Sequence, residues 1–269
     1  MGFSIAGKTA IVTGAANGIG LSIGRHFANQ GANVMFADMD ETQLKAEIGD
    51  LAKKEENVRF FAGDLRERLT QANLLSATID AFDRVDILVN ASRQVLTSDP
   101  LCAEDDAVEQ LLQQNMVTSL RMSQMIAKRF IKQAEDDTEE DNSIGTIINL
   151  SSILATRTHP DLMAFSVAAA AADQMTRSLA VALAKHRIRV NAVAFGSVMS
   201  CSLKDTLKDH RDYRADIEAH TPMGRIASPS EVAEAVHFLA SDAASFMTGQ
   251  IVTVDGGRTL LDTVAAPAH

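Results

Sequence analysis

A glycine-rich turn near the N-terminus constrains the fold of this chain more than any other feature. It runs from Thr13 to Gly20 and follows residues 9–13, whose β-branched and apolar side chains predict a strand buried on both faces. Apolar residues then recur at helical spacing as far as Phe27, and Gly31 supplies a stop signal. Glycines at such a corner let the backbone approach a diphosphate, and the helix N-terminus offers it unpaired N–H groups.

The next strand predicts which nucleotide this turn binds. Residues 33–37 are mostly apolar and lead into Asp38, 18 residues after Gly20. A carboxylate there suits the two hydroxyls of an adenosine ribose and repels a 2′-phosphate. Asn17 and Met39 are neutral where a binder of the 2′-phosphate usually carries Arg or Lys. We therefore expect the cofactor NAD(H) rather than NADP(H), and the alternative is a structural glycine turn without a ligand.

Composition argues against several other classes of protein. The net charge of −10 disfavours a nucleic-acid or anionic-membrane partner, because either partner favours a basic face. No apolar run reaches transmembrane length, and the N-terminus does not resemble a signal peptide. Cys102 and Cys201 are too few for a disulfide framework, so we expect two reduced thiols and a cytoplasmic protein.

Beyond Asp38, helical and strand patterns keep alternating. We expect helices at 41–54, 69–82, 105–132, 162–185 and 229–239, and strands at 58–62, 86–90, 145–150, 189–195 and 250–254. Repeated βα units without a linker predict an α/β protein: one doubly wound, mainly parallel Rossmann-type sheet over residues 1–269, with helices on both faces. The acidic run 135–141 predicts a solvated loop rather than a cation site. Residues 200–220 predict a mobile lid, and residues 258–269 a tail.

Several motifs together resemble the short-chain dehydrogenase/reductase superfamily, over a match from about Phe3 to Gly257. Besides the glycine motif, they include an Asp-Leu pair that contacts adenine, a strand tail that is normally Asn-Asn-Ala-Gly, and a Pro-Gly-x-Val-x-Thr segment that clasps the nicotinamide amide. Arg93 stands at the glycine position of the tail, and Phe195 at the proline position of the last segment. The resemblance implies a cofactor-binding set of Gly14, Asn17, Gly18, Ile19, Gly20, Asp38, Met39, Asp64, Leu65, Asn90, Ala91, Ser92, Gly196, Val198 and Ser200.

The same resemblance implies two catalytic residues, Ser152 at the end of its strand and Asn115 on a helix. The Tyr-x-x-x-Lys pair of the family begins 13 residues after the serine, which leads here to Phe165 and Ala169. Flanking residues fix this register, and the only tyrosine of the chain is Tyr213, in the expected lid. The pair is therefore replaced, either by natural drift or by an engineered knockout.

This replacement removes the usual proton donor. Carbonyl reduction needs a proton at oxygen while hydride arrives at carbon, and losing a positioned acid typically costs ~10²–10⁴ in rate. His159 and Asp161 shortly precede Phe165, and a histidine is a candidate acid or base, although a surface-loop histidine is the simpler interpretation. Arg93 could orient an anionic substrate or polarise a carbonyl, or it could instead pair with a carboxylate. No His, Cys, Asp or Glu spacing indicates zinc, so we expect no metal.

Three functions stay open at this point. The first is an NAD-dependent oxidoreductase with a rewired proton donor, acting on a small carbonyl or alcohol substrate. The second is a non-redox NAD(H)-binding regulator, or a catalytically silent subunit partnered with an active relative. The third is a lyase or isomerase. The resemblance also implies a homo-oligomer, a tetramer or dimer, formed through the two long helices and the last strand.

Overall fold

The computed structural model describes residues 2–102, 104, 106–135, 143–210 and 212–262. The acidic run expected at 135–141 lies almost wholly outside the described residues, and so does most of the expected tail. In the part of the chain that is described, no helix combines the length and the apolar character needed to cross a bilayer.

One parallel sheet forms the centre of the molecule. Its order is β3-β2-β1-β4-β5-β6-β7, and every neighbouring pair is parallel. The doubly wound sheet predicted from the sequence is therefore confirmed. The order reverses direction between β1 and β4, and sheets of this kind bind ligands beyond the carboxyl ends of such strands. The strands are β1 (Thr9–Thr13), β2 (Asn33–Asp38), β3 (Val58–Ala62), β4 (Ile87–Asn90), β5 (Gly145–Ser152), β6 (Ile188–Phe195) and β7 (Ile251–Val254).

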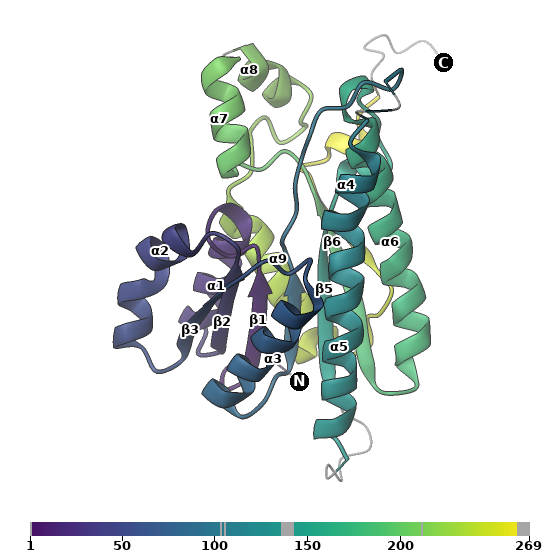
Figure 1. Ribbon diagram of the computed structural model, residues 1–269. Coiled ribbons are helices and arrows are strands. Elements are labelled where there is room, and N and C mark those ends of the chain that lie inside the picture. Colours follow the sequence, from purple (N-terminus) through teal and green to yellow (C-terminus); the bar gives the residue numbers. More distant parts are fainter. Residues whose placement is uncertain (1, 103, 105, 136–142, 211, 263–269) are drawn as a thin grey trace.

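The helices depart from the expected pattern at two places. The helix expected at 105–132 is divided, because Gln113–Val117 forms one π-helical turn. The expected lid at 200–220 contains two helices, which lie together at one end of the molecule (Figure 1). Neither of these two helices buries a residue. The helices are α1 (Gly18–Asn29), α2 (Glu41–Lys54), α3 (Arg68–Phe82), α4 (Val108–Leu112), α5 (Thr118–Gln133), α6 (Met163–Ala184), α7 (Cys201–Asp209), α8 (Asp212–Ala219) and α9 (Pro229–Ala240).

Successive side chains of the strands pack into two separate cores. Ile11 of β1 belongs to the core that α3, α5 and α6 cover, whereas Val12 belongs to the core covered by α1, α2 and α9. Figure 1 shows α5 and α6 running along one face of the sheet. Strands buried on both faces need apolar residues at every position, which is why they appear in the sequence as continuous apolar runs.

The residues before α9 fix the start of that helix. Pro229 occupies its first turn, and Ser228 and Glu231 form a capping box. Arg225 forms an ion pair with Glu231 at 2.6 Å, and its hydrogen bonds lower the pKa of Glu231 to about 2. Side chains of neighbouring residues thus cap the N-terminus of α9, whereas the N-terminus of α1 has no side-chain cap.

Gly24 marks a close contact between α1 and the sheet. A Cβ atom there would overlap the ring of Phe36, which is fully buried in β2. We expect Gly24→Ala to lower the free energy of unfolding by about 1–2 kcal/mol, because overpacking outweighs the helix propensity that alanine adds. Gly49→Ala in α2 has open space around its Cβ and should raise that free energy by about 0.5–1 kcal/mol. Urea unfolding measures the free energy of unfolding of both variants. A Gly24→Ala variant more stable than the parent would show that the Phe36 ring can shift at little cost.

Candidate functional site

The turn after β1 is fastened to the end of β4 by one side chain. Thr13 Oγ1 accepts hydrogen bonds from the backbone N–H groups of Ala91 at 3.0 Å and Ser92 at 3.1 Å. Gly14 follows at φ +63°, and a Cβ there would lie 2.6 Å from the Cα of Ser92. The two segments therefore meet backbone against backbone, and glycine is the residue that fits between them.

The first turn of α1 is open to a ligand. Asn17 precedes the helix in an extended conformation, and its side chain makes no capping hydrogen bond. A Cβ on Gly20 would overlap the carbonyl group of Gly14, so the turn also has no space for side chains. Gly18 begins the helix at φ +54°, and buried Ile19 anchors it in the core. Uncapped N–H groups at a helix N-terminus favour a phosphate.

Asp38 lies at the carboxyl end of β2 and contacts the glycine turn. Its Oδ2 accepts a hydrogen bond from the N–H of Ala16 at 3.0 Å, and its Oδ1 accepts one from the N–H of Asp40 at 3.1 Å. Each oxygen keeps a further lone pair for a ribose hydroxyl. The neighbouring Met39 is exposed. The carboxylate is therefore held in place by backbone groups and still has acceptor capacity.

The Asp64–Leu65 pair follows β3 and is engaged by its neighbours. Arg66 forms an ion pair with Asp64 at 2.6 Å, and its side-chain hydrogen bonds lower the pKa of Asp64. The Leu65 side chain is buried, and its carbonyl accepts a hydrogen bond from Gln71 Nε2 at 2.6 Å. Asp64 is thus held as an anion, and its contact with adenine stays a prediction.

Polar side chains join the carboxyl ends of β4 and β5 to the helices behind them. Asn90 Nδ2 donates to Asn149 Oδ1 at 2.8 Å and to Ser123 Oγ at 3.0 Å. Ser92 Oγ accepts a hydrogen bond from Gln114 Nε2 at 3.0 Å. The strand ends are therefore held by a largely buried network rather than left to move.

The segment after β6 is held in place by contacts at two of its residues, Val198 and Ser200. It begins at Gly196, and the next predicted contact, Val198, is buried and pairs with Ala227 in an isolated parallel bridge. Ser200 Oγ accepts a hydrogen bond from the N–H of Leu203 at 3.2 Å and caps α7. The sequence from Gly196 to Ser200 therefore connects β6 directly to α7.

The two predicted catalytic residues have well-defined partners. Ser152 ends β5, is buried, and accepts a hydrogen bond from the N–H of Leu154 at 3.2 Å through its Oγ. Asn115 lies in the π-helical turn, a feature often found at functional sites. Its side chain binds the backbone of Gln94 twice, accepting from the N–H and donating to the carbonyl, both at 2.8 Å. Asn115 thus fixes the chain that leaves β4, and catalytic roles for both residues stay a prediction.

Phe165 and Ala169 are both buried on α6. Phe165 forms an apolar cluster with Leu111, Ala164 and Ala168. Leu96, Val108, Leu112, Leu154 and Leu162 are among the partly buried residues that pack against it. Neither Phe165 nor Ala169 carries a proton that it can donate, so this face of α6 supplies apolar surface and no acid.

Arg93 brings a positive charge to this apolar surface. Its guanidinium carbon lies 4.0 Å from the ring centroid of Phe195 and 5.8 Å from that of Phe165. Its Nη1 donates to the carbonyl of Ser151 at 3.2 Å. Burial lowers the pKa of Arg93 to about 10, so the group stays charged at neutral pH. The alternative expectation of a carboxylate partner is wrong for the residues that the structure describes, because none of them forms an ion pair with Arg93.

The other candidate donors are engaged elsewhere. His159 is largely exposed, and its Nδ1 accepts a hydrogen bond from the N–H of Asp161 at 3.3 Å, where a short 3₁₀ turn begins. Tyr213 of α8 is 49% exposed and stacks on His210, with ring centroids 4.5 Å apart. These contacts favour the simpler interpretation of His159 as a surface-loop residue.

Sequence reasoning named Arg93 and Phe195 as separate departures but missed that they touch. Each residue comes at or after the carboxyl end of a strand, β4 for Arg93 and β6 for Phe195. Because parallel strands end at the same edge of the sheet, two such departures are candidates for a contact. The pair of hydrogen bonds between the Asn115 side chain and the Gln94 backbone had no comparable signal in the sequence, since it depends on the π-helical turn.

A reversal in strand order with an uncapped helix beside it defines a Rossmann-type α/β protein. A sequence model for the family described as Enoyl-(Acyl carrier protein) reductase matches residues 14–259. The chain is 35% identical to the cis-4-hydroxycyclohexanecarboxylate dehydrogenase of Sinomonas cyclohexanicum, over 96% of this chain and 99% of the relative. It is 32% identical to the short chain dehydrogenase/reductase astE of Aspergillus oryzae, over 96% and 97% of the two chains.

A solved structure leads to the same assignment. The crystal structure of gox2181 matches with a TM-score of 0.87 at 31% identity, over 96% of this chain and 98% of the other. The chain therefore belongs to the short-chain dehydrogenase/reductase superfamily, a family of oxidoreductases.

The Thr13 hydroxyl should contribute strongly to stability. Thr13→Val keeps the shape of the side chain but leaves two buried N–H groups without their acceptor, and we expect a loss of about 2–4 kcal/mol in the free energy of unfolding. Thr78→Val is the matched control, because Thr78 Oγ1 only donates to the carbonyl of Leu74 within α3. Chemical denaturation measures both, and equal effects would contradict a special role for Thr13.

Proposed function

We propose that this chain is an NAD(H)-dependent oxidoreductase that acts on a small carbonyl or alcohol substrate bearing a carboxylate group. The observation that carries the proposal is Arg93, a half-buried cation beside Phe165 and Phe195 with no ion-pair partner in the described chain. Burying a charge without a counter-ion is costly, and an anionic ligand relieves that cost. A carboxylate fits the planar guanidinium through two parallel hydrogen bonds.

The residues around the glycine turn fit a dinucleotide. There is no space for a Cβ at Gly14, the N-terminus of α1 is uncapped, and Asp38 presents acceptors beside the turn. When bound, NADH supplies a hydride. These features support NAD(H), because the carboxylate of Asp38 accepts from ribose hydroxyls and repels a 2′-phosphate.

The proposed reaction differs from that of the family at Phe165 and Ala169, which stand where the Tyr-x-x-x-Lys pair is expected. The Arg93 guanidinium would bind the substrate carboxylate, and the Ser152 hydroxyl would donate to the reacting oxygen. That oxygen would take its proton from water, because neither Phe165 nor Ala169 can supply one. We therefore expect slow turnover, lower by ~10²–10⁴ than with a positioned acid.

A second candidate function is a catalytically silent NAD(H)-binding protein. It is favoured by the packing of Phe165, which belongs to an apolar cluster rather than a polar site. It is also favoured by the Asn115 side chain, which is occupied by the backbone of Gln94. Such a protein binds NADH without turnover, as a regulator or as the partner of an active relative.

Asp38 provides a direct test of cofactor choice. Asp38→Asn removes one charge and keeps the side-chain shape, so we expect the ratio of the NADH and NADPH dissociation constants to shift at least about tenfold toward NADPH. Asp40→Asn is the matched control, because it removes a neighbouring charge and keeps an oxygen to cap α2. Calorimetry with both nucleotides measures the ratio. A preference that Asp38→Asn leaves unchanged would contradict the assignment of Asp38.

Arg93 provides the test of the substrate. We expect Arg93→Met to lower kcat/KM for hydroxy- and oxocarboxylates about 10- to 100-fold relative to uncharged analogues, because a charge-assisted contact is lost. Arg121→Met on the exposed face of α5 is the control. Absorbance at 340 nm follows turnover, and calorimetry follows NADH binding.

Restoring the missing acid separates the two candidate functions. An active parent enzyme that gains rate in Phe165→Tyr with Ala169→Lys supports the oxidoreductase. A parent that binds NADH but turns over no substrate, while the double variant does, supports the silent protein. Failure of the parent to bind either nucleotide would contradict both.

A further inference from the structure

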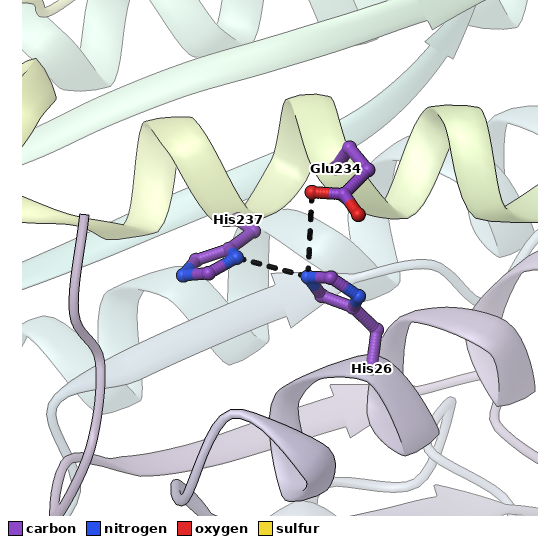
Figure 2. Close-up of side chains that lie close together, drawn as sticks. All are labelled: His26, Glu234 and His237. Carbon is purple, nitrogen blue, oxygen red and sulfur yellow. Dashed lines mark hydrogen bonds and ion pairs between the residues drawn. The ribbon is translucent and has the colours of Figure 1, made fainter.

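Three side chains that can ligate a metal meet between α1 and α9, near the C-terminal end of α1 and away from the glycine turn at its N-terminal end. His26 comes from the last turn of α1, and Glu234 and His237 lie one turn apart on α9 (Figure 2). One donor atom from each residue lies within 4.8 Å of the others. His26 is more than 200 positions from Glu234 and His237 in the sequence, so residue spacing could not reveal that the three meet.

The structure fixes the tautomer of His237. Its Nε2 lies 2.7 Å from the backbone carbonyl of Phe3, and a carbonyl only accepts, so Nε2 carries the proton. In the neutral ring, Nδ1 is then left with a free lone pair, which points at His26 (Figure 2). A histidine that donates from one nitrogen to a backbone carbonyl while the other nitrogen faces a cation is the usual arrangement of a metal ligand.

The donor atoms converge around His26. Its Nε2 lies 2.9 Å from His237 Nδ1 and 3.7 Å from a carboxylate oxygen of Glu234. A hydrogen bond between the two imidazoles accounts for the first distance, whereas 3.7 Å is too long for a hydrogen bond and lies within the range of an ion pair.

We propose that His26, Glu234 and His237 form a binding site for a zinc ion. Donors around a tetrahedral zinc ion lie about 3.3 Å apart, between the two distances observed, so small side-chain movements suffice. Two imidazoles and one carboxylate are a known ligand set for zinc. The Glu234 side chain is 69% exposed, which leaves the fourth position open to water.

The site would tie three parts of the chain together. Zinc would link α1 to α9, and the hydrogen bond from His237 would hold the segment at Phe3 against both. Because the ligands lie about two helical turns from Gly18, the ion would stabilise the helix that carries the glycine turn without touching a nucleotide. This inference does not depend on the proposed oxidoreductase activity.

Zinc titration of the tag-free, chelator-treated full-length protein tests the site. We expect one equivalent of Zn²⁺ to bind and to raise Tm, since a ligand that binds the folded state stabilises it. Co²⁺ should give visible absorption bands of a site with nitrogen and oxygen ligands. No binding at one equivalent, or a Tm that zinc leaves unchanged, would overturn the proposal.

Variants identify the ligands. His26→Gln and His237→Gln should each abolish the rise in Tm and weaken zinc binding more than about tenfold. Both keep an amide that can hydrogen-bond, and Tm in chelator reports whether each still folds. His220→Gln is the control, because His220 pairs with Asp216 on the exposed face of α8 and should retain full zinc binding. Equal binding by the parent, His26→Gln and His237→Gln would overturn the assignment of these residues.

Discussion

The fold depends on how β1 is joined to β4 where the strand order reverses. At this point two chain segments approach so closely that Gly14 has no space for a side chain, and the Thr13 hydroxyl satisfies two N–H groups that would otherwise be buried without partners. Unpaired buried donors are costly, so this one oxygen stabilises the close approach of the two segments at the reversal. The uncapped start of α1 and the carboxylate of Asp38 are placed by the same turn.

The sheet could be predicted because its signals are local and mutually consistent. Apolar runs such as 9–13 and 188–195 are too continuous for an exposed strand, and the helical periodicity between them leaves parallel pairing as the solution. The π-helical turn at Gln113–Val117 could not be predicted, since it is a small change within a continuous helical pattern. Helices α7 and α8 were missed for a different reason. They are short and bury no residues, and the one apolar pair at helical spacing in α7, Leu203 and Leu207, is too small a signal to identify a helix.

The candidate site shows a similar division. Its glycines and Asp38 were visible as a motif, because backbone geometry dictates which residues fit there. The contacts of Arg93 were not visible, since cation–aromatic packing carries no spacing rule and depends on where two strands end. The cluster of His26, Glu234 and His237 could not be predicted from the sequence either. It arises from the packing of α1 on α9, which only the folded chain brings together.

On our proposal, the departures from the family motifs at Arg93, Phe165, Ala169 and Phe195 form one coherent change. A phenol at position 165 would be a polar group among leucines, whereas Phe165 joins the apolar cluster around it. A lysine at position 169 would place a second cation near Arg93. Like charges close together disfavour each other's charged forms. With Ala169 in its place, the cation that we propose for this site is Arg93, whose guanidinium lies beside the rings of Phe195 and Phe165. Even with its pKa lowered to about 10 by burial, the Arg93 guanidinium keeps its charge at neutral pH. The site is therefore better suited to holding an anion than to delivering a proton, and any catalysis that it retains must rest on orientation and charge.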